Sequence, residues 1–251
     1  MSTESPQAEH VGRHRAPEGP SAVRVVWLYP DLLSTYGDRG NMLILARRAQ
    51  VRGIPVETVE VRSDQPVPDQ GDIYLLGGGE DGPQALAANR LNADRGLHRA
   101  LARGAALFAV CAGYQLVGTS FFAKGERCAG LELLDLYSDR GPTRAVGELA
   151  GTPDPELGLP TITGFENHGG RTHLGQGLRP LARVTTGVGN DGQTEGVWAG
   201  RIVGTYMHGP ALARNPAIAD LLLTWVLGAP VTPIDDTWPM RLRAERLAAV
   251  R

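Results

Sequence analysis

Short apolar runs alternate with longer amphipathic segments over residues 23–110, and this alternation constrains the fold more than any other feature of the chain. Four runs have the length and composition of strands: 23–29, 54–61, 72–79 and 105–110. Between them, 36–53 reads as a turn and a helix, and 83–104 reads as a helix with a break at Gly96. Strands that alternate with helices predict an α/β fold, with a largely parallel central sheet flanked by helices.

The second half of the chain has a different pattern. After residue 128 the sequence predicts shorter strands and glycine turns, with a polar loop over FENHGGRTHLG, residues 165–175. A helix is expected over 215–228, with Asn215 as its N-cap and Gly228 after its end. We expect a disordered tail at 1–21, one domain at 22–229 and an extension at 230–251 whose end fits either an amphipathic helix or a frayed tail.

Composition and charge exclude several classes of protein. The formal net charge is −2, so no basic bias points to nucleic acid. Two cysteines do not make a disulfide framework, and no cluster of metal ligands is visible, so we expect no metal. The first residues lack the apolar core of a signal peptide, and no apolar run reaches membrane-spanning length. The expectation is a cytoplasmic protein with reduced thiols.

One cysteine stands where an apolar strand would turn into a helix, in FAVCAGYQLVG (108–118). Active sites of open α/β sheets lie at the carboxyl ends of the strands, and a helix N-terminus favours a thiolate. Small residues around Cys111 suit a sharp strand-to-helix turn that carries a nucleophile. A buried core cysteine is the alternative, and the residues alone leave both open. Cys128 lacks this setting and is interpreted as structural.

A cysteine nucleophile needs an oxyanion pocket and a base. The glycines in LLGGGEDGPQ (75–84) offer backbone N–H groups for the pocket, although a plain glycine turn is the alternative. Of the six histidines, His208 in IVGTYMHGP follows an apolar strand and is the first candidate for the base. His168 ranks second because it lacks a strand-end position, and a solvated loop histidine is the alternative for both.

The glycine run, VCAGYQ and TYMHGP together resemble the class I glutamine amidotransferases, in which a cysteine attacks the side-chain amide of glutamine and releases ammonia. In that family a glutamine follows the nucleophile by four positions, as Gln115 does here. Most members carry a glutamate two residues after the histidine, where this chain has Pro210. In this respect the chain resembles the cobyric acid synthase branch, in which the histidine also lacks that glutamate.

Five segments narrow the resemblance: LYPDLLSTYGDRGN, LLGGGEDGPQALA, CAGYQLVG, GFENHGGRT and GTYMHGP. In this order they resemble the glutaminase subunits of lipid II isoglutaminyl synthases, over most of residues 23–228. The resemblance implies a single amidotransferase domain and a heterodimer with a Mur-ligase-like subunit. That partner would bind ATP and use the ammonia to amidate the α-carboxylate of D-glutamate in lipid II, so no cofactor is expected on this chain.

The resemblance also assigns roles to individual residues. Cys111 matches the nucleophile, His208 the base, and Arg144 an arginine that binds the substrate L-glutamine, whose α-carboxylate suits a guanidinium. Without the family, Arg144 would be interpreted as an ordinary surface arginine. By position, the candidates for oxyanion and pocket contacts are Gly78, Gly79, the Ala112 amide and Gln115.

No neighbour of His208 in the sequence orients its imidazole, since Pro210 replaces the usual glutamate. We therefore hypothesise that a carboxylate of the partner subunit completes the site. The segments 36–41 and 164–171 border either the glutamine pocket or the interface with the partner, and the sequence does not separate the two.

Three other functions are alternatives to this assignment. The first is an amidotransferase for a corrin-type acceptor, but such enzymes usually fuse the synthetase domain into the same chain, and no G-x-x-x-x-G-K-[ST] loop is present here. The second is a cysteine hydrolase of similar fold. The third is a non-catalytic binding subunit, which the joint presence of Cys111, Gln115 and His208 disfavours.

Overall fold

A computed structural model describes residues 22–249, so the tail predicted at 1–21 and the last two residues of the extension lie outside the described residues. Its first sheet has the strand order β11-β12-β4-β3-β1-β2. The strands are β1 (Val23–Leu28), β2 (Val56–Val61), β3 (Ile73–Leu76), β4 (Ala106–Val110), β11 (Val197–Ala199) and β12 (Ile202–Thr205). All neighbours pair in parallel except β11 with β12. The predicted parallel sheet is confirmed.

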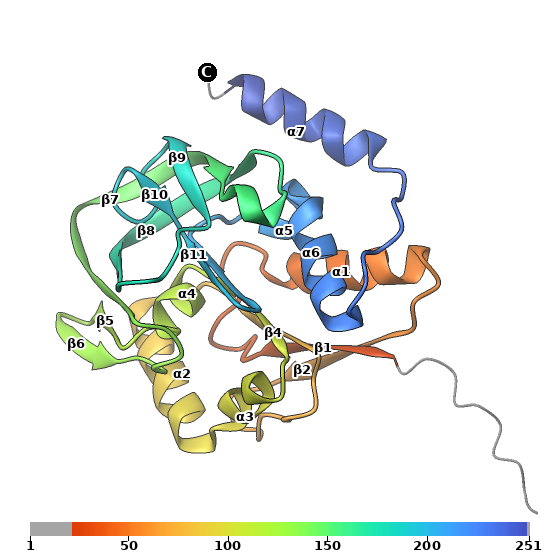
Figure 1. Ribbon diagram of the computed structural model, residues 1–251. Coiled ribbons are helices and arrows are strands. Elements are labelled where there is room, and N and C mark those ends of the chain that lie inside the picture. Colours follow the sequence, from red (N-terminus) through yellow and green to blue (C-terminus); the bar gives the residue numbers. More distant parts are fainter. Residues whose placement is uncertain (1–21, 250–251) are drawn as a thin grey trace, which may run out of the picture.

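Helices cover both faces of this sheet, with α1 and α6 on one side and α2 and α3 on the other (Figure 1). They are α1 (Arg39–Val51), α2 (Asp81–Asp94), α3 (Gly96–Ala102), α4 (Ala112–Leu116), α5 (Ala211–Arg214), α6 (Pro216–Leu227) and α7 (Thr237–Ala249). The predicted helix at 83–104 is broken at Arg95, which adopts a left-handed conformation with φ of 60° one residue before Gly96. None of the helices within residues 22–249 is long and apolar enough to cross a membrane.

A second, mostly antiparallel sheet accounts for the change of pattern after residue 128. Its strands are β5 (Ser120–Ala123), β6 (Glu126–Ala129), β7 (Leu136–Pro153), β8 (Ile162–Leu174), β9 (Ala182–Thr186) and β10 (Thr194–Glu195), and a 3-10 turn at Pro155–Leu157 separates β7 from β8. The polar loop expected at 165–175 is wrong, because those residues belong largely to β8. The buried positions of β8 include Glu166 and His168. These two side chains bond to each other, so polar residues can occupy the buried face of a strand.

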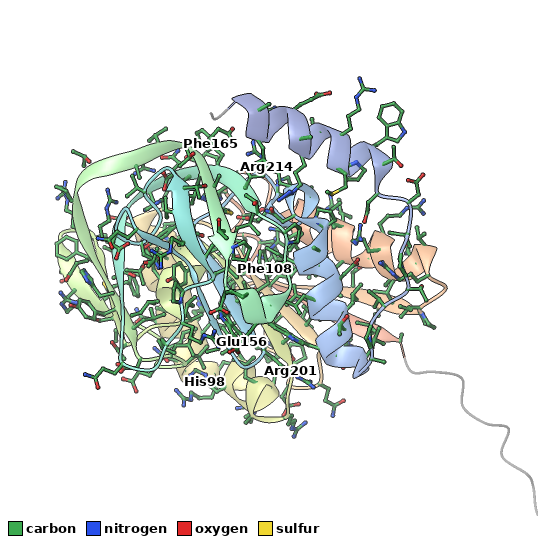
Figure 2. The ribbon with its side chains drawn as sticks, turned by 45° about the horizontal axis from the view of Figure 1, so that its top comes forward. His98, Phe108, Glu156, Phe165, Arg201 and Arg214 are labelled. Carbon is green, nitrogen blue, oxygen red and sulfur yellow. The ribbon has the colours of Figure 1, made fainter. Side chains whose placement is uncertain are left out.

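The two sheets meet where β8 passes the end of β12. Phe165 of β8 and His208 exchange two backbone hydrogen bonds of 2.8 and 3.1 Å. Glu148 of β7 lies opposite Phe165 and forms an ion pair with Arg214 of α5. Figure 2 labels Phe165 and Arg214 side by side at this junction, with Phe108 of β4 in the middle of the molecule. The junction fixes His208 between the parallel sheet and the second sheet.

The C-terminal segments also refine the expectations. Asn215 occupies the predicted N-cap position of α6, but its side chain does not cap the helix. It bonds instead to the backbone N–H and carbonyl of Thr163, which ties α6 to β8. The extension continues as the helix α7, not as a frayed tail, and buried Arg48 of α1 connects it to α6 through Asp220 and Asp236.

Candidate active site

Cys111 lies on a sharp turn between β4 and α4. Its φ and ψ angles are 53° and −107°, a left-handed conformation that costs a non-glycine residue about 1–3 kcal/mol. The turn is fixed by hydrogen bonds from the Cys111 N–H to the Thr205 carbonyl, at 2.8 Å, and from the Gly113 N–H to the Gly77 carbonyl, at 3.0 Å. A Cβ at Gly113 would lie 2.8 Å from the Leu76 carbonyl oxygen, so only glycine fits there. This is the strand-to-helix elbow expected from the sequence.

The thiol is protonated in this conformation. Burial raises the pKa of Cys111 to about 12, the nearby Asp38 carboxylate adds to this rise, and the Ala112 amide and Arg144 oppose it. The start of α4 acts in the expected direction, since the Ala112 amide lowers the pKa of Cys111, but burial outweighs this effect. The reason is that α4 has only five residues and the thiol is shielded from water, so the loss of hydration outweighs the helix dipole.

His208 and Cys111 meet at Gly78. A Cβ added to Gly78 would lie 2.8 Å from His208 Cε1 and 3.6 Å from Cys111 Cβ, so both side chains approach the same point, from beyond the ends of β12 and β4. Alanine at this position would collide with the imidazole. The structure thus brings together three of the residues singled out from the sequence, and the close approach explains why the position is a glycine.

The imidazole of His208 is buried and has no hydrogen-bond partner for either ring nitrogen among residues 22–249. Tyr36 packs edge-on against it, with ring centroids 4.9 Å apart. Burial, followed by the smaller effect of the charge of His168, lowers the pKa of His208 to about 4. His208 is therefore a neutral imidazole at neutral pH, which is the protonation state that a general base requires.

The backbone N–H of Gly78 is not free to bind an oxyanion. It donates to Asp38 Oδ2 at 2.6 Å, and burial raises the pKa of this carboxyl group to about 7. Of the predicted oxyanion donors, Gly79 and Ala112 line the cavity beside Cys111, whereas Gly78 is engaged by Asp38. Gly78 can serve as a donor only if Asp38 leaves it, and this corrects the expectation from the sequence.

A cavity of about 380 Å³ opens next to the thiol, within the range of small-molecule sites. It lies between the strand ends of the first sheet and the two long strands of the second. Charged side chains of both signs line it, which suits a zwitterionic ligand. The lining residues are Gly79, Glu80, Asp81, Gln84, Cys111, Ala112, Gln115, Phe122, Gly125, Arg140, Gly141, Pro142, Thr143, Arg144, Asn167, His168, Gly169 and Gly170.

Arg144 reaches this cavity from β7, although its side chain is largely exposed. Its Nε donates to Asn167 Oδ1 at 2.6 Å, and Asn167 Nδ2 in turn donates to the Tyr36 hydroxyl. These bonds orient the guanidinium from one side and leave other N–H groups available to a ligand. The structure therefore places Arg144 in the wall of the same cavity as Cys111.

Gln115 and His168 are both held by internal hydrogen bonds. Gln115 accepts from Gln84 at 2.8 Å and donates to the Tyr206 hydroxyl at 3.1 Å, which fixes the first turn after the nucleophile. Both ring nitrogens of His168 are engaged, with Glu166 and with the Gly170 carbonyl. His168 is therefore not placed to accept a proton from Cys111, whereas the nitrogens of His208 are unengaged.

Several residues of the site were not singled out from the sequence, among them Asp38, Glu166 and Asn167. Asp38 and Asn167 lie in the segments 36–41 and 164–171, which were noted only as polar and glycine-rich. The signal in 164–171 was alternation, because Glu166 and His168 point to the same face of a strand. No local signal marks the contact of Asp38 with Gly78, because it joins residues 40 positions apart.

Comparison with known proteins agrees with this geometry. The model of the CobB/CobQ-like glutamine amidotransferase domain matches residues 24–216. The lipid II isoglutaminyl synthase (glutamine-hydrolyzing) subunit GatD of Staphylococcus aureus strain N315 is 38% identical, over 77% of this chain and 79% of its own length. The GatD subunit of Streptococcus pneumoniae strain R6 is 35% identical, over 83% and 82%.

More distant matches have the same domain in other contexts. Cobyric acid synthase of Sphingopyxis alaskensis is 31% identical, over 67% of this chain and only 34% of its own length. A crystal structure of a glutamine amidotransferase superimposes with a TM-score of 0.56 at 19% identity, covering 82% of this chain and 99% of that one, which shows the shared fold. By its sequence, its fold and its relatives, the chain belongs to the family of CobB/CobQ-like glutamine amidotransferases and is an enzyme of that class.

Proposed function

We propose that this chain is the glutaminase subunit of a lipid II-amidating enzyme and hydrolyses L-glutamine to glutamate and ammonia. The observation that carries the proposal is the position of Cys111, on a strained elbow in the wall of a polar cavity, with His208 and the cysteine converging on Gly78. The GatD relatives, at 35–38% identity over most of both chains, support the acceptor assignment.

Glutamine would bind with its α-carboxylate toward Arg144, where Asn167 orients the guanidinium. Its ammonium group would face the acidic side of the cavity, which Glu80 and Asp81 line. The side-chain amide then points toward Cys111. In this orientation each charge of the amino acid faces a side chain of opposite charge in the cavity.

Catalysis begins with proton transfer from the thiol to His208, followed by attack of the sulfur on the amide carbon. Backbone N–H groups near Gly79 and Ala112 stabilise the tetrahedral oxyanion, joined by Gly78 once Asp38 has moved. His208 returns the proton to the leaving nitrogen, and ammonia departs from a thioester. Water activated by His208 then releases glutamate and restores the thiol.

The ammonia would pass to a Mur-ligase-like partner that binds ATP and amidates the D-glutamate α-carboxylate of lipid II. The pKa of the thiol is about 12 and the pKa of the imidazole is about 4, so proton transfer from Cys111 to His208 is unfavourable in this conformation. We propose that the partner relieves this by supplying a carboxylate to His208, whose nitrogens lack partners within residues 22–249. Tyr36, which is 44% exposed, would have to move aside.

The test is ammonia release from glutamine by the purified chain, alone and with its Mur-ligase-like partner. Cysteine-dependent release that increases with the partner is expected, with Cys111→Ala inactive and Cys128→Ala active as the matched control. Equal rates with and without the partner would contradict the shared site. Turnover retained in Cys111→Ala would contradict the glutaminase assignment.

A further inference from the structure

His168 is the one cavity-lining histidine, and its buried ring lies between two hydrogen-bond acceptors. Nδ1 lies 2.9 Å from the Gly170 carbonyl oxygen, and Nε2 lies 3.0 Å from Glu166 Oε2. A carbonyl oxygen has no proton to donate, so the bond to Gly170 requires a proton on Nδ1. The protonation state of the ring therefore depends on whether Glu166 donates or accepts.

Glu166 is an acceptor on both oxygens. The Val188 N–H donates to Oε1 at 2.7 Å, and the Gly189 N–H donates to Oε2 at 2.9 Å. Although burial raises the pKa of Glu166, the bonds from His168 and these two amides lower it below its usual value. Because Glu166 accepts from two amides, it is an acceptor toward Nε2 as well, so both ring nitrogens of His168 face acceptors.

The pair of His168 and Glu166 contacts residues near the nucleophile and residues of the glutamine-binding wall. The ring of His168 stacks on Tyr206 with a centroid distance of 3.7 Å, and the Tyr206 hydroxyl accepts from Gln115, four residues after the nucleophile. Between the two members of the pair lies Asn167, which orients Arg144. A change of charge at His168 would therefore affect the glutamine-binding wall and the chemistry.

We propose that His168 is a positioning residue which, held as a cation by Glu166, fixes the Asn167–Gly170 wall of the glutamine pocket and keeps His208 neutral. The proposal rests on the proposed glutaminase function. The other titratable or charged groups around the pair are Tyr206 and His208 after β12, Glu195 on β10 and Arg171 on β8, which also donates to the Gly170 carbonyl.

The electrostatic part follows from the sign of the charges. Beyond the effect of burial, the positive charge of His168 lowers the pKa of His208. A second cation beside the first is unfavourable, so His208 stays neutral until the partner stabilises its protonated form. Removal of the cation would raise the pKa of His208 and leave it protonated over a wider pH range.

The first experiment reads the protonation of His168 directly. The full chain, with ¹⁵N-labelled histidine, is examined by NMR from pH 6 to pH 8, and His168→Gln assigns the resonances. Two protonated ring nitrogens at His168 throughout this range, with one protonated nitrogen at His208, are expected. A single protonated nitrogen at His168 at pH 7 would overturn the proposal, whatever the chain's activity.

The second experiment measures turnover in the complex with the partner. His168→Gln and Glu166→Gln should raise the KM for glutamine about tenfold, by disturbing the orientation of Arg144, and reduce kcat less. They should also move the acid limb of the pH–kcat profile to higher pH. His173→Gln, an exposed histidine on the same strand, is the matched control and should leave both unchanged.

An unchanged KM and acid limb in a folded His168→Gln complex would contradict the proposal. An inactive wild-type complex would contradict the proposed function instead, and the NMR result would still decide the state of His168. If neither substituted chain folds, sequential backbone assignment of the unmodified chain identifies the His168 ring, and its NMR spectrum carries the decision.

Discussion

Two buried histidines, His168 and His208, lie on either side of the site and are held in opposite ways. His168 on β8 has a partner for each ring nitrogen, whereas His208 beyond β12 has none among the described residues. A fully bonded histidine is fixed in position and charge, and an unbonded one can accept and release a proton. Under the proposed function, this difference assigns binding and orientation to β8 and the chemistry to the end of β12.

The largest expected difference between the two histidines is the effect of their substitution on kcat. His208→Gln should lower kcat for glutamine hydrolysis by about 10²- to 10⁴-fold, because the general base is lost. His168→Gln should retain most of kcat. Steady-state kinetics of the complex measures both, and a smaller loss at His208 than at His168 would reverse the assignment of roles.

Stability should show the reverse order. Loss of one member of a buried ion pair leaves an unpaired charge, so His168→Gln should lower the free energy of unfolding by about 3 kcal/mol. His208→Gln removes no hydrogen bond within residues 22–249 and should cost much less at pH 8. Denaturant unfolding of both variants measures these free energies. Equal losses of unfolding free energy would show that the His208 ring forms a stabilising hydrogen bond, which contradicts the unbonded ring described above.

The pH dependence of stability sharpens the contrast. The pKa of His208 is lowered to about 4 from an unfolded value of about 6.5, so the unfolded chain takes up this proton first as the pH falls. Its contribution is present above pH 6.5 and is lost as the pH falls toward 4. At pH 5 the loss is about 2 kcal/mol, and His208→Gln should remove it.

Unfolding free energies of the two chains at pH 8 and pH 5 provide the check. The difference between the two pH values should be smaller in His208→Gln than in the wild type. His173→Gln, at an exposed histidine on β8, is the control for general effects of losing a histidine. An undiminished difference in His208→Gln would contradict a neutral buried imidazole.

The smallest expected effect lies on the binding side. Arg144→Gln should raise the KM for glutamine about tenfold, the loss of one charge-assisted contact, with kcat reduced less. Arg140, which lines the same cavity, offers a matched control in Arg140→Gln. A fall in kcat without a change in KM would show that Arg144 acts in the chemical step and not in glutamine binding.

The parallel half of the fold was predictable because its signals are local. The strands β1, β3 and β4 are short apolar runs, β3 and β4 end directly before Gly77 and Cys111, and the positions of the helices follow from the spacing of the strands. The elbow could be predicted for the same reason. The break at Arg95 differs from the predicted glycine by one residue, within the usual uncertainty of element boundaries.

Short strands after residue 128 were predicted, but the strand that covers most of 165–175 and the bonds of its polar residues could not be, because those residues are satisfied by partners distant in the sequence. Glu166 accepts from amides 22 and 23 residues away, and Arg144 is oriented by Asn167 across two strands. The raised pKa of Cys111 and the engagement of Gly78 by Asp38 likewise depend on long-range packing. A sequence pattern shows which side chains are available, and packing decides which of them are already bonded.

The most direct test of the account is covalent capture of the nucleophile by an electrophilic glutamine analogue such as acivicin, with the partner present, read by peptide mass spectrometry. We predict one adduct, on Cys111, that excess glutamine prevents, that His208→Gln slows strongly and that His168→Gln slows through weaker binding. Equal modification of Cys128, or modification of Cys111 that glutamine does not prevent, would contradict a glutaminase site built from Cys111 and His208.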